Sequence, residues 1–210
     1  MALDGNWART WVELSAASMA EHRTELIHLD RNIGDGDHGE NMDRGFQAAL
    51  GKLSTLEDGA TPADVLKLLA TTLISTVGGA AGPLYGTAFL KGAVALKGKA
   101  ELDPADVAAF VEAASAGLQQ RGKAQPGDKT MVDAWSPAAS AAQKASDAGE
   151  DAVSVLRAAA FAAVEGAAAT EPLVARKGRA SYLGERSAGH RDPGAQSTAY
   201  LLGAAVEAAS

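Results

Sequence analysis

The alanine content of this chain restricts its fold more than any other feature of the sequence. Alanine fills 48 of the 210 positions, whereas valine and isoleucine together fill 15 and aromatic residues make up 5%. Alanine loses less free energy than any other residue on entering a helix, whereas sheets favour β-branched and aromatic residues. The composition therefore predicts an all-α protein, and the length is sufficient for a real hydrophobic core.

Helical periodicity and helix-start signals divide the chain into eight segments. Apolar residues recur at helical spacing in the first segment, as at Trp7 and Trp11. A polar N-cap residue followed by proline is a common helix start, and it occurs at Thr61-Pro62, Asp103-Pro104 and Asp192-Pro193. The predicted helices span about 4–29, 40–53, 61–77, 78–97, 103–120, 130–148, 150–169 and 192 to the end.

Polar stretches separate these helices without dividing the chain. Residues 30–39 and 121–129 are predicted loops, and the helix over 130–148 is expected to bend at Pro137. Residues 170–191 indicate either a long ordered loop or a helix with a broken middle. Because no stretch resembles a linker, we expect residues 1–210 to form a single domain, an antiparallel bundle or barrel of about eight amphipathic helices. Two four-helix bundles are the alternative.

Charge and cysteine content exclude several classes of function. The chain carries 19 basic and 26 acidic side chains, a net charge of -7, and no long basic tract, which argues against nucleic acid or anionic membranes as partners. Without cysteine it cannot form disulfides, thiolate zinc sites or iron–sulfur clusters. It has no signal-peptide pattern and no uninterrupted apolar run of the ~18 residues that a membrane span needs. We therefore expect a soluble cytoplasmic protein.

The stretch 29–41 crowds three aspartates between two predicted helices. Asp30, Asp35 and Asp37 lie among three glycines, which allow the backbone to turn tightly. Unpaired carboxylates at this spacing would repel one another, and hard oxygen ligands suit Mg²⁺, Ca²⁺ or Mn²⁺. The stretch therefore predicts a divalent-cation site, although a helix N-cap with incidental acids is the simpler alternative.

Two familiar motifs fit this stretch poorly. An EF-hand needs a glutamate at its twelfth position, where a loop counted from Asp30 has Asn41 and one counted from Asp35 has Phe46. The glycines also match G-x-G-x-x-G, but they follow a helical pattern rather than a strand, and the intervening aspartates would repel a pyrophosphate unless a metal bridged them. A phosphate reached through a metal is the favoured interpretation.

Two further segments are compatible with phosphate binding. Residues 78–82, Gly-Gly-Ala-Ala-Gly, precede a helix and leave backbone N–H groups free to face an anion, although close helix packing explains them equally well. The window 176–191 carries five basic residues against one acid, Glu185. A solvated helix face is the usual reason for such a cluster, but beside a metal–phosphate site it would screen the charge of a transferring phosphoryl group. Among the histidines, only His38 stands out, because it lies inside the aspartate stretch.

Four motifs in order resemble those of the nucleotide-binding L subunits of dihydroxyacetone kinases, and they span almost the whole chain. They are residues 29–42, 78–80, 121–131 and 192–195, which read LDRNIGDGDHGENM, GGA, RGKAQPGDKTM and DPGA. The resemblance implies a barrel of eight amphipathic antiparallel helices with the nucleotide at one end. This agrees with the eight helical segments predicted from the residues.

The resemblance also implies which residues form the site. Asp30, Asp35 and Asp37 would hold two Mg²⁺ ions, which would hold the phosphates of ADP or ATP, and Arg179 would stabilise charge during transfer. Nucleotide contacts would come from His38, Gly39, Glu40, Asn41, Gly79, Ala80, Gly122, Met131, Arg179, Asp192, Pro193 and Gly194. Ala81 stands where relatives commonly have serine, which removes a side-chain hydroxyl from the glycine-rich segment but leaves its backbone N–H.

The same resemblance implies a phosphotransferase that is active only with partner subunits. The K subunit, which holds dihydroxyacetone covalently through a histidine, has no room in 210 residues. The phosphoryl donor would be a phosphohistidine on an M subunit of the phosphotransferase system. A second hypothesis is an ATP-dependent kinase subunit for dihydroxyacetone or another short ketose such as erythrulose. A third, non-enzymatic one is a nucleotide-sensing regulator of a transcription factor, and a homodimer is left open.

Overall fold

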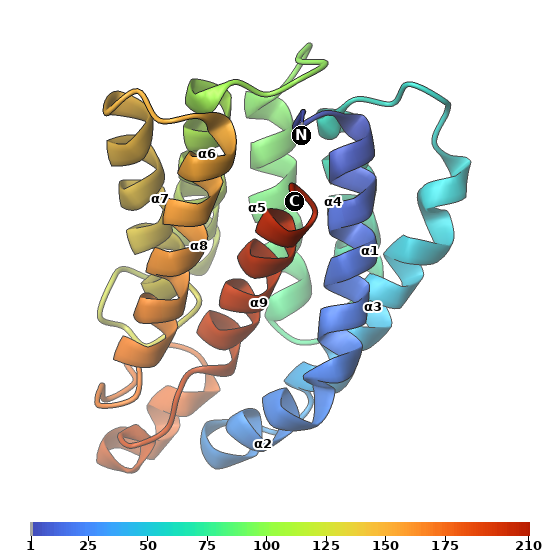
Figure 1. Ribbon diagram of the computed structural model, residues 1–210. Helices are drawn as coiled ribbons and strands as arrows, with labels where there is room; N and C mark the ends of the chain where they lie inside the picture. The colour runs from blue at the N-terminus through green and yellow to red at the C-terminus, as the bar shows by residue number, and fades with distance from the viewer. Residues whose placement is uncertain (1) are drawn as a thin grey trace.

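The computed structural model describes residues 2–210 and is all-α, as the composition predicts (Figure 1). Within these residues, the only β-type pairing is an isolated bridge between Asp4 and Glu101. The helices are α1 (Gly5–Glu21), α2 (Arg23–Ile33), α3 (His38–Lys52), α4 (Pro62–Thr76), α5 (Ala81–Ala95), α6 (Pro104–Gly122), α7 (Val132–Asp147), α8 (Ala152–Ala169) and α9 (Pro193–Glu207), with two 3₁₀ segments, η1 (Leu53–Thr55) and η2 (Arg179–Ser187).

Eight of these helices form a closed ring. α1 packs on α3, α3 on α4, and each helix from α4 to α8 packs on the next, until α9 closes the ring against α1. Successive members of the ring run antiparallel, so the connections α2–α3, α4–α5, α6–α7 and α8–α9 meet at one end, the lower end in Figure 1. α2 lies outside the ring at this end, against α3, α9 and η2. The predicted all-α barrel is therefore confirmed.

The prediction of one continuous helix over residues 4–29 is wrong. The chain leaves α1 at His22, and α2 continues to Ile33, so Asp30 lies on the last turn of a helix and the loop shrinks to residues 34–37. The His22 ring stacks on Tyr200 of α9 with 3.9 Å between centroids, and the Tyr200 hydroxyl donates a 2.6 Å hydrogen bond to Glu25. A contact with a distant part of the chain therefore accompanies the break, and helical periodicity does not report such contacts.

The later segments follow the predicted order with shifted ends. α6 extends to Gly122, so the loop expected over 121–129 begins later and runs to the start of α7. α7 passes through Pro137 as one helix. Residues 170–191 form the long ordered loop of the two alternatives, with one 3₁₀ segment, η2, which is itself interrupted at Gly184, whose φ of 54° is not helical.

Aromatic residues are few, but most of them gather in the interior of the barrel, with Phe161 and Tyr182 the exposed exceptions. Trp11 meets Phe89 and Phe110 edge-on, with centroid distances of 5.8 and 5.7 Å. Trp135 meets the same two rings at 6.4 and 6.5 Å. The Trp11 indole also donates a 2.7 Å hydrogen bond to the backbone carbonyl of Leu201 in α9. The large side chains thus fill the barrel and fasten α1 to α9, where the ring closes.

Small residues let α7 and α8 approach each other closely. The buried positions of both helices are mostly alanine. A Cβ atom on Gly166 of α8 would fall 2.2 Å from the carbonyl oxygen of Asp133 in α7. By length and composition alone α8 could cross a membrane, but its buried face packs on α7 and α9 as one wall of the barrel. The alanine content therefore serves the close packing of helices.

Substitutions at two helical glycines test this packing. Gly166→Ala should lower the free energy of unfolding by about 1–3 kcal/mol, because the added methyl group meets backbone that cannot move aside. Gly203→Ala in α9 is the matched control, since no atom lies within 4 Å of the added Cβ. It should raise the free energy of unfolding by roughly 0.5–1 kcal/mol through helix propensity. Urea unfolding followed by circular dichroism measures both, and equal effects at the two positions would contradict the argument.

Candidate functional site

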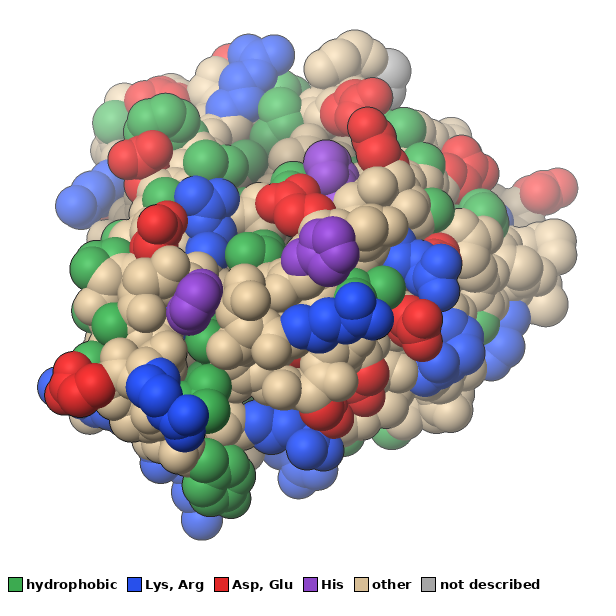
Figure 2. All heavy atoms as spheres, turned by 90° about the horizontal axis from the view of Figure 1, so that it is seen from below, with side chains coloured by type: hydrophobic (Ala, Val, Ile, Leu, Met, Phe, Trp, Pro, Cys, Tyr) green, Lys and Arg blue, Asp and Glu red, His purple; other side chains and the backbone are tan. Residues whose placement is uncertain are grey.

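The four connections at the lower end of the barrel surround one cavity. Figure 2 shows this end from below, with charged and histidine side chains mixed over its surface. The cavity is bounded by the end of α2, the three connections α4–α5, α6–α7 and α8–α9, and the start of α3. Its lining residues are Asp30, Ile33, Gly34, Asp35, Asp37, His38, Asn41, Gly78, Gly79, Ala80, Ala81, Leu84, Lys129, Thr130, Met131, Lys177, Gly178, Arg179, Ala180, Asp192, Pro193 and Gly194.

Helix starts differ between the two ends of the barrel. At the end away from the cavity, α1, α4, α6 and α8 begin with capping side chains, those of Asp4, Thr61, Asp103 and Asp151. At the cavity end, the N-cap residues of α3, α5 and α7 accept no such bond, and only that of α9 does; these residues are Asp37, Ala80, Met131 and Asp192. At the start of α7 the Val132 N–H is already taken by the Thr130 hydroxyl at 3.1 Å, but free N–H groups at the starts of α3 and α5, together with the helix dipole, favour an anion. The cavity end is therefore suited to phosphate oxygens.

Asp30 is held in place by the loop that follows it. Its Oδ2 atom accepts hydrogen bonds from the backbone N–H of Asp37 at 2.9 Å and of His38 at 3.1 Å. A Cβ atom at position 34 would lie 2.1 Å from Asp30 Oδ1, and Gly36 has a φ of +76°, so both glycines are needed for the loop to fold over the carboxylate. The glycines of the aspartate stretch therefore have a geometric role.

The three aspartates of the loop converge. Asp30, Asp35 and Asp37 can each offer one carboxylate oxygen, and these oxygens lie within 4.8 Å of one another. Burial, opposed by the two backbone hydrogen bonds and reinforced by the neighbouring carboxylates, raises the pKa of Asp30. Arg179 forms an ion pair with Asp35 at 3.1 Å, which offsets part of the negative charge. A set of hard oxygen donors with excess negative charge fits a divalent cation such as Mg²⁺.

A buried hydrogen-bond network lies behind this loop and joins three helices. His38 Nε2 at the start of α3 is 2.9 Å from the Ser197 hydroxyl of α9. The Tyr85 hydroxyl of α5 is 2.7 Å from the same Ser197 hydroxyl, 2.9 Å from that of Thr198, and donates to the Gly194 carbonyl at 2.9 Å. Burial lowers the pKa of His38 to about 4, so its ring is neutral at physiological pH. The network fixes the starts of α3 and α9 relative to each other.

Asp192 faces the cavity from the start of α9. Its Oδ2 atom accepts a 2.8 Å hydrogen bond from the backbone N–H of Ala195, as an N-cap does, and its own N–H donates to the Thr170 hydroxyl at 2.9 Å. Burial raises the pKa of Asp192 to about 7, with smaller contributions from the negative charges of Asp133 and Asp30. The cavity therefore holds a second carboxyl group whose pKa is raised.

A second cavity of about 400 Å³ adjoins the first, on the side of α5, α6 and α7. The two share Ala80, Leu84, Met131 and neighbouring residues, and the second is largely apolar. It is lined by Ala80, Pro83, Leu84, Leu118, Arg121, Gly122, Ala124, Thr130, Met131, Val132, Lys177 and Gly178. Together the cavities match a ligand with an anionic end and a flat apolar end.

Most residues singled out in the sequence come together here. Asp30, Asp35, Asp37, His38, Asn41, Gly79, Ala80, Met131, Arg179, Asp192, Pro193 and Gly194 line the first cavity, and Gly122 lines the second. The side chain of Glu40 instead turns outward and pairs with Arg23 at 3.0 Å. Gly39 packs against α2, where a Cβ would lie 2.2 Å from the Arg23 carbonyl oxygen. Neither lines a cavity with a side chain.

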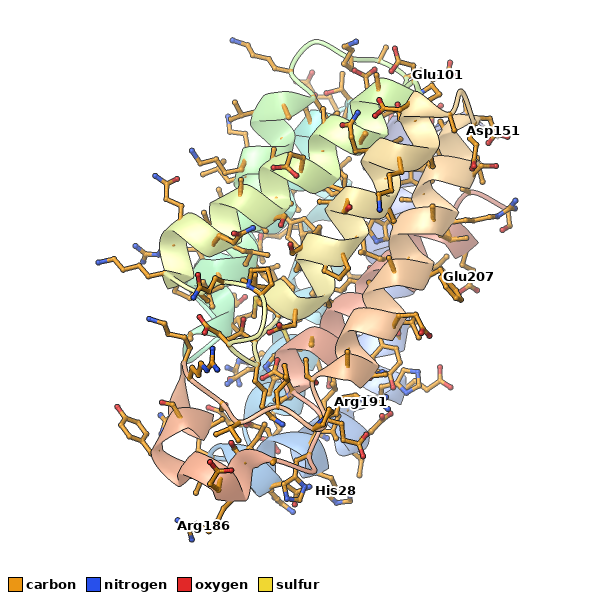
Figure 3. All side chains as sticks on the ribbon, turned by 90° about the vertical axis from the view of Figure 1, so that its left-hand side faces the viewer. His28, Glu101, Asp151, Arg186, Arg191 and Glu207 are labelled. Atoms are coloured by element: carbon orange, nitrogen blue, oxygen red, sulfur yellow. The ribbon has the colours of Figure 1, made fainter. Side chains whose placement is uncertain are left out.

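The basic window does not face the cavity as a whole. Only Lys177 and Arg179 of its basic residues line it. Arg186 lies at the lower edge of the molecule and points away from the barrel (Figure 3). An Arg191 N–H instead donates to the Gln196 side chain at 2.9 Å. The cluster is thus part site and part solvated surface.

Lys129 is the lining residue that the sequence analysis missed most clearly. It is only 1% exposed, and its ammonium group contacts the backbone carbonyl oxygens of Thr170, Glu171, Leu173 and His190. Thr130 and Gly178 also line both cavities without having been singled out, and Lys177 of the basic window lines both as well. Lys129 and Thr130 both lie inside the 121–131 motif, so membership of that motif was the sequence feature that could have identified them as site residues.

The pKa of Asp192 predicts how stability depends on pH without metal or nucleotide. Because folding raises this pKa from 3.8 to about 7, the protonated carboxyl group favours the folded state. In EDTA, the contribution of Asp192 to the free energy of unfolding should therefore fall as pH rises from about 4 to about 7, whereas that of His38, whose pKa is lowered to about 4, should rise over much of the same range. Asp192→Asn keeps a capping side chain but removes the titration, so the parent should lose stability relative to this variant as pH rises. Urea unfolding across this range measures the slopes, and parallel curves would refute the assignment.

Comparison with known proteins matches this geometry. The family described as the DAK2 domain matches residues 32–207. The ADP-binding subunit DhaL of PEP-dependent dihydroxyacetone kinase 1 from Listeria innocua is 42% identical over 207 residues, which cover 99% of this chain and 98% of that protein. The ADP-binding subunit DhaL of the PEP-dependent dihydroxyacetone kinase from Escherichia coli is 40% identical, over 96% of each chain.

A solved structure shows the same fold. The dihydroxyacetone kinase from C. freundii, in complex with AMP-PNP and Mg²⁺, superimposes with a TM-score of 0.70 and 25% sequence identity. The match covers 99% of this chain and 34% of the longer C. freundii chain. From its family match and its near full-length similarity to these subunits, the chain belongs to the DAK2-domain family that includes the DhaL subunits of PEP-dependent dihydroxyacetone kinases.

Proposed function

We propose that this chain is the ADP-binding subunit of a PEP-dependent dihydroxyacetone kinase, a phosphotransferase that acts only with its partner subunits. Bound ADP would take a phosphoryl group from a phosphohistidine on an M subunit of the phosphotransferase system and pass it to dihydroxyacetone held on a K subunit. The observation that carries the proposal is the convergence of three carboxylates, within 4.8 Å, on a cavity with uncapped helix starts. These partner subunits would place the protein in the cytoplasm.

The aspartate loop would hold two Mg²⁺ ions. Asp30, Asp35 and Asp37 supply oxygen donors only, and Mg²⁺ usually completes its coordination with phosphates and water. When bound, the ions would neutralise phosphate oxygens and help to hold donor and acceptor in line. The Asp37 and His38 amides keep Asp30 oriented toward this position, so the chain presents the carboxylates in a fixed arrangement.

The nucleotide would lie across both cavities. Its phosphates would meet the starts of α3, α5 and α9, and its base would enter the apolar cavity beside Gly122 and Met131. Gly39 and Glu40 would contribute through backbone N–H groups on the uncapped first turn of α3, because the Glu40 side chain faces outward. The proposed contacts are His38, Gly39, Glu40, Asn41, Gly79, Ala80, Gly122, Met131, Arg179, Asp192, Pro193 and Gly194.

Arg179 is the residue we propose to stabilise charge during transfer. Arg179 lines the cavity and its guanidinium reaches Asp35 at 3.1 Å, so it would lie beside the phosphate position. Arginine is permanently charged and suits the spread-out charge of a transferring phosphoryl group. No covalent bond to this chain is needed for the relay.

A second candidate is a subunit that exchanges ATP directly. The C. freundii kinase, whose structure this chain matches, was solved with AMP-PNP and Mg²⁺. Dihydroxyacetone or another short ketose such as erythrulose would then be phosphorylated with ATP and the K subunit alone. Heating the purified protein and identifying the released nucleotide by mass spectrometry separates retained ADP from an empty, exchanging site. Turnover with phosphoenolpyruvate or with ATP then identifies the donor.

Loss of the carboxylate of either Asp35 or Asp37, the two aspartates of the loop itself, should weaken metal-dependent nucleotide binding without unfolding the chain. Asp35→Asn and Asp37→Asn should each weaken Mg²⁺-dependent ADP binding by more than the roughly 10- to 100-fold that loss of an outer-shell partner costs. Asp58→Asn, on an exposed turn far from the cavity, is the matched control and should bind normally. Isothermal titration calorimetry with and without Mg²⁺ measures the affinities. Parent protein that binds no ADP in the presence of Mg²⁺ would overturn the proposed function.

Substitution of Arg179 should affect turnover more than nucleotide retention. Arg179→Ala should lower turnover with phosphoenolpyruvate and partner subunits at least about tenfold, because a charge near the transferring group is lost. Arg179→Lys should recover only part of the rate, since an ammonium lacks the planar fork. Steady-state rates together with ADP content after desalting test this. An unchanged rate with Arg179→Ala would remove Arg179 from the mechanism.

A further inference from the structure

The side chain of Lys129 is fully engaged inside the protein. Lys129 lies in the α6–α7 connection with a φ of 62°, in the left-handed region that non-glycine residues seldom adopt. Its Nζ atom is 2.9 Å from the Thr170 carbonyl oxygen, 3.2 Å from that of Glu171 and 3.0 Å from that of Leu173, and it also contacts that of His190. An ammonium group has three donors, so these carbonyls use all of them. Lys129 therefore has no donor left for a ligand.

The four carbonyls belong to the two ends of one segment. We call residues 170–190 the arc; it leaves the end of α8 and returns just before Asp192 and α9. Thr170, Glu171 and Leu173 lie at the start of the arc, and His190 is its last residue. Carbonyls beyond the end of a helix lack partners within it and attract a positive charge. One ammonium group thus closes the base of the arc.

Backbone hydrogen bonds reinforce the same base. The Arg176 N–H donates to the carbonyl of Asp128, the neighbour of Lys129, at 3.1 Å, and the Gly189 N–H donates to the Glu171 carbonyl at 2.8 Å. Beyond these contacts the arc has one further buried tie, from the Ala175 N–H to the Ser187 hydroxyl at 2.8 Å, and only two buried apolar residues, Ala175 and Ala180, which cluster with Ile33 of α2. The position of the arc therefore depends on its base more than on a core of its own.

The arc carries the basic side of the site. Lys177 and Arg179 line the cavity from it, and Arg179 reaches Asp35 of the aspartate loop at 3.1 Å. A shift at the base of the arc would move Arg179 away from the carboxylates, because the arc has little packing of its own to hold it in place. The geometry therefore connects a buried lysine with an arginine that lines the same cavity.

We propose that Lys129 is a positioning residue, which closes the base of the arc and thereby places Arg179 over the aspartate loop. The proposal rests on the proposed function only in that Arg179 acts on bound nucleotide. Lysine suits this role because a compact ammonium can meet several carbonyls that converge on one point, whereas a planar guanidinium cannot. The negative charges of Asp192, Glu171 and Asp133 offset part of the cost of burying the cation.

Limited proteolysis tests the structural half of the proposal in the full chain without nucleotide. The arc contains four trypsin sites, after Arg176, Lys177, Arg179 and Arg186. Lys129→Met should speed the initial cleavage at these sites at least about tenfold, while the circular dichroism spectrum stays that of a folded barrel. Lys99→Met is the matched control: Lys99 pairs with Asp106 at 2.8 Å at the opposite end of the barrel, and its loss should leave cleavage of the arc unchanged. Unchanged cleavage in Lys129→Met would overturn the proposal.

A second variant covers the case in which Lys129→Met does not fold. Lys129→Arg keeps the charge and similar bulk but cannot meet all four carbonyls, so it should also expose the arc to trypsin. If Lys129→Arg protects the arc as well as lysine does, a charge at this point is sufficient and the specific closure by an ammonium group is wrong.

A double-mutant cycle tests whether Lys129 acts through Arg179. Lys129→Met should lower turnover about tenfold in the parent chain but less than about twofold beside Arg179→Ala, because the arginine that it positions is then absent. Effects that simply multiply would show a general structural role and overturn the positioning role. Parent protein without Mg²⁺-dependent ADP binding would refute the proposed function, whereas the trypsin result would still decide whether Lys129 closes the arc.

Discussion

The close approach of neighbouring helices is the constraint on which the rest of this structure depends. A ring of eight helices can close around a small core only if the axes come near to one another, and this requires small residues where the helices meet. Gly166 lies against the backbone of α7, and a Cβ on Gly92 of α5 would fall 2.5 Å from the Phe110 ring. Closing the ring also decides where the loops lie. In a ring of antiparallel helices every second connection lies at the same end, so loops far apart in the sequence surround one cavity.

That cavity gathers charges that do not balance within the chain. Burial raises the pKa values of Asp30 and Asp192, and Asp35 and Asp37 add further negative charge beside Asp30. The protein offsets part of this with the Asp37 and His38 amides and with Arg179, but it leaves three carboxylates converging. Such repulsion is unfavourable in the chain alone and is relieved when a cation binds. In proteins that bind ligands, the binding site often has unfavourable electrostatics, and favourable packing elsewhere in the fold compensates for it.

The sequence predicted the helices and the residues of the aspartate loop because both depend on local patterns. Composition and helix-start signals do not report tertiary contacts, so the stacking of His22 on Tyr200 and the break between α1 and α2 were not foreseen. Composition and helix-start signals also do not predict the direction of a side chain. Glu40 points toward Arg23, although neighbouring residues line the cavity. Lys129 was missed for the same reason, since its four carbonyl partners lie more than forty positions away in the chain.

Helix capping shows how a departure from a local rule marks the site. At the end away from the cavity, capping side chains satisfy the first turn of each helix, and these are the starts that the sequence predicts best. At the cavity end Asp37 occupies the N-cap position of α3 but does not cap it, because its carboxylate joins the cluster with Asp30 and Asp35. Ala80 has no group with which to cap α5. The free N–H groups at the starts of α3 and α5 and the three converging carboxylates therefore occur together, and an anion bound through a cation satisfies both at once.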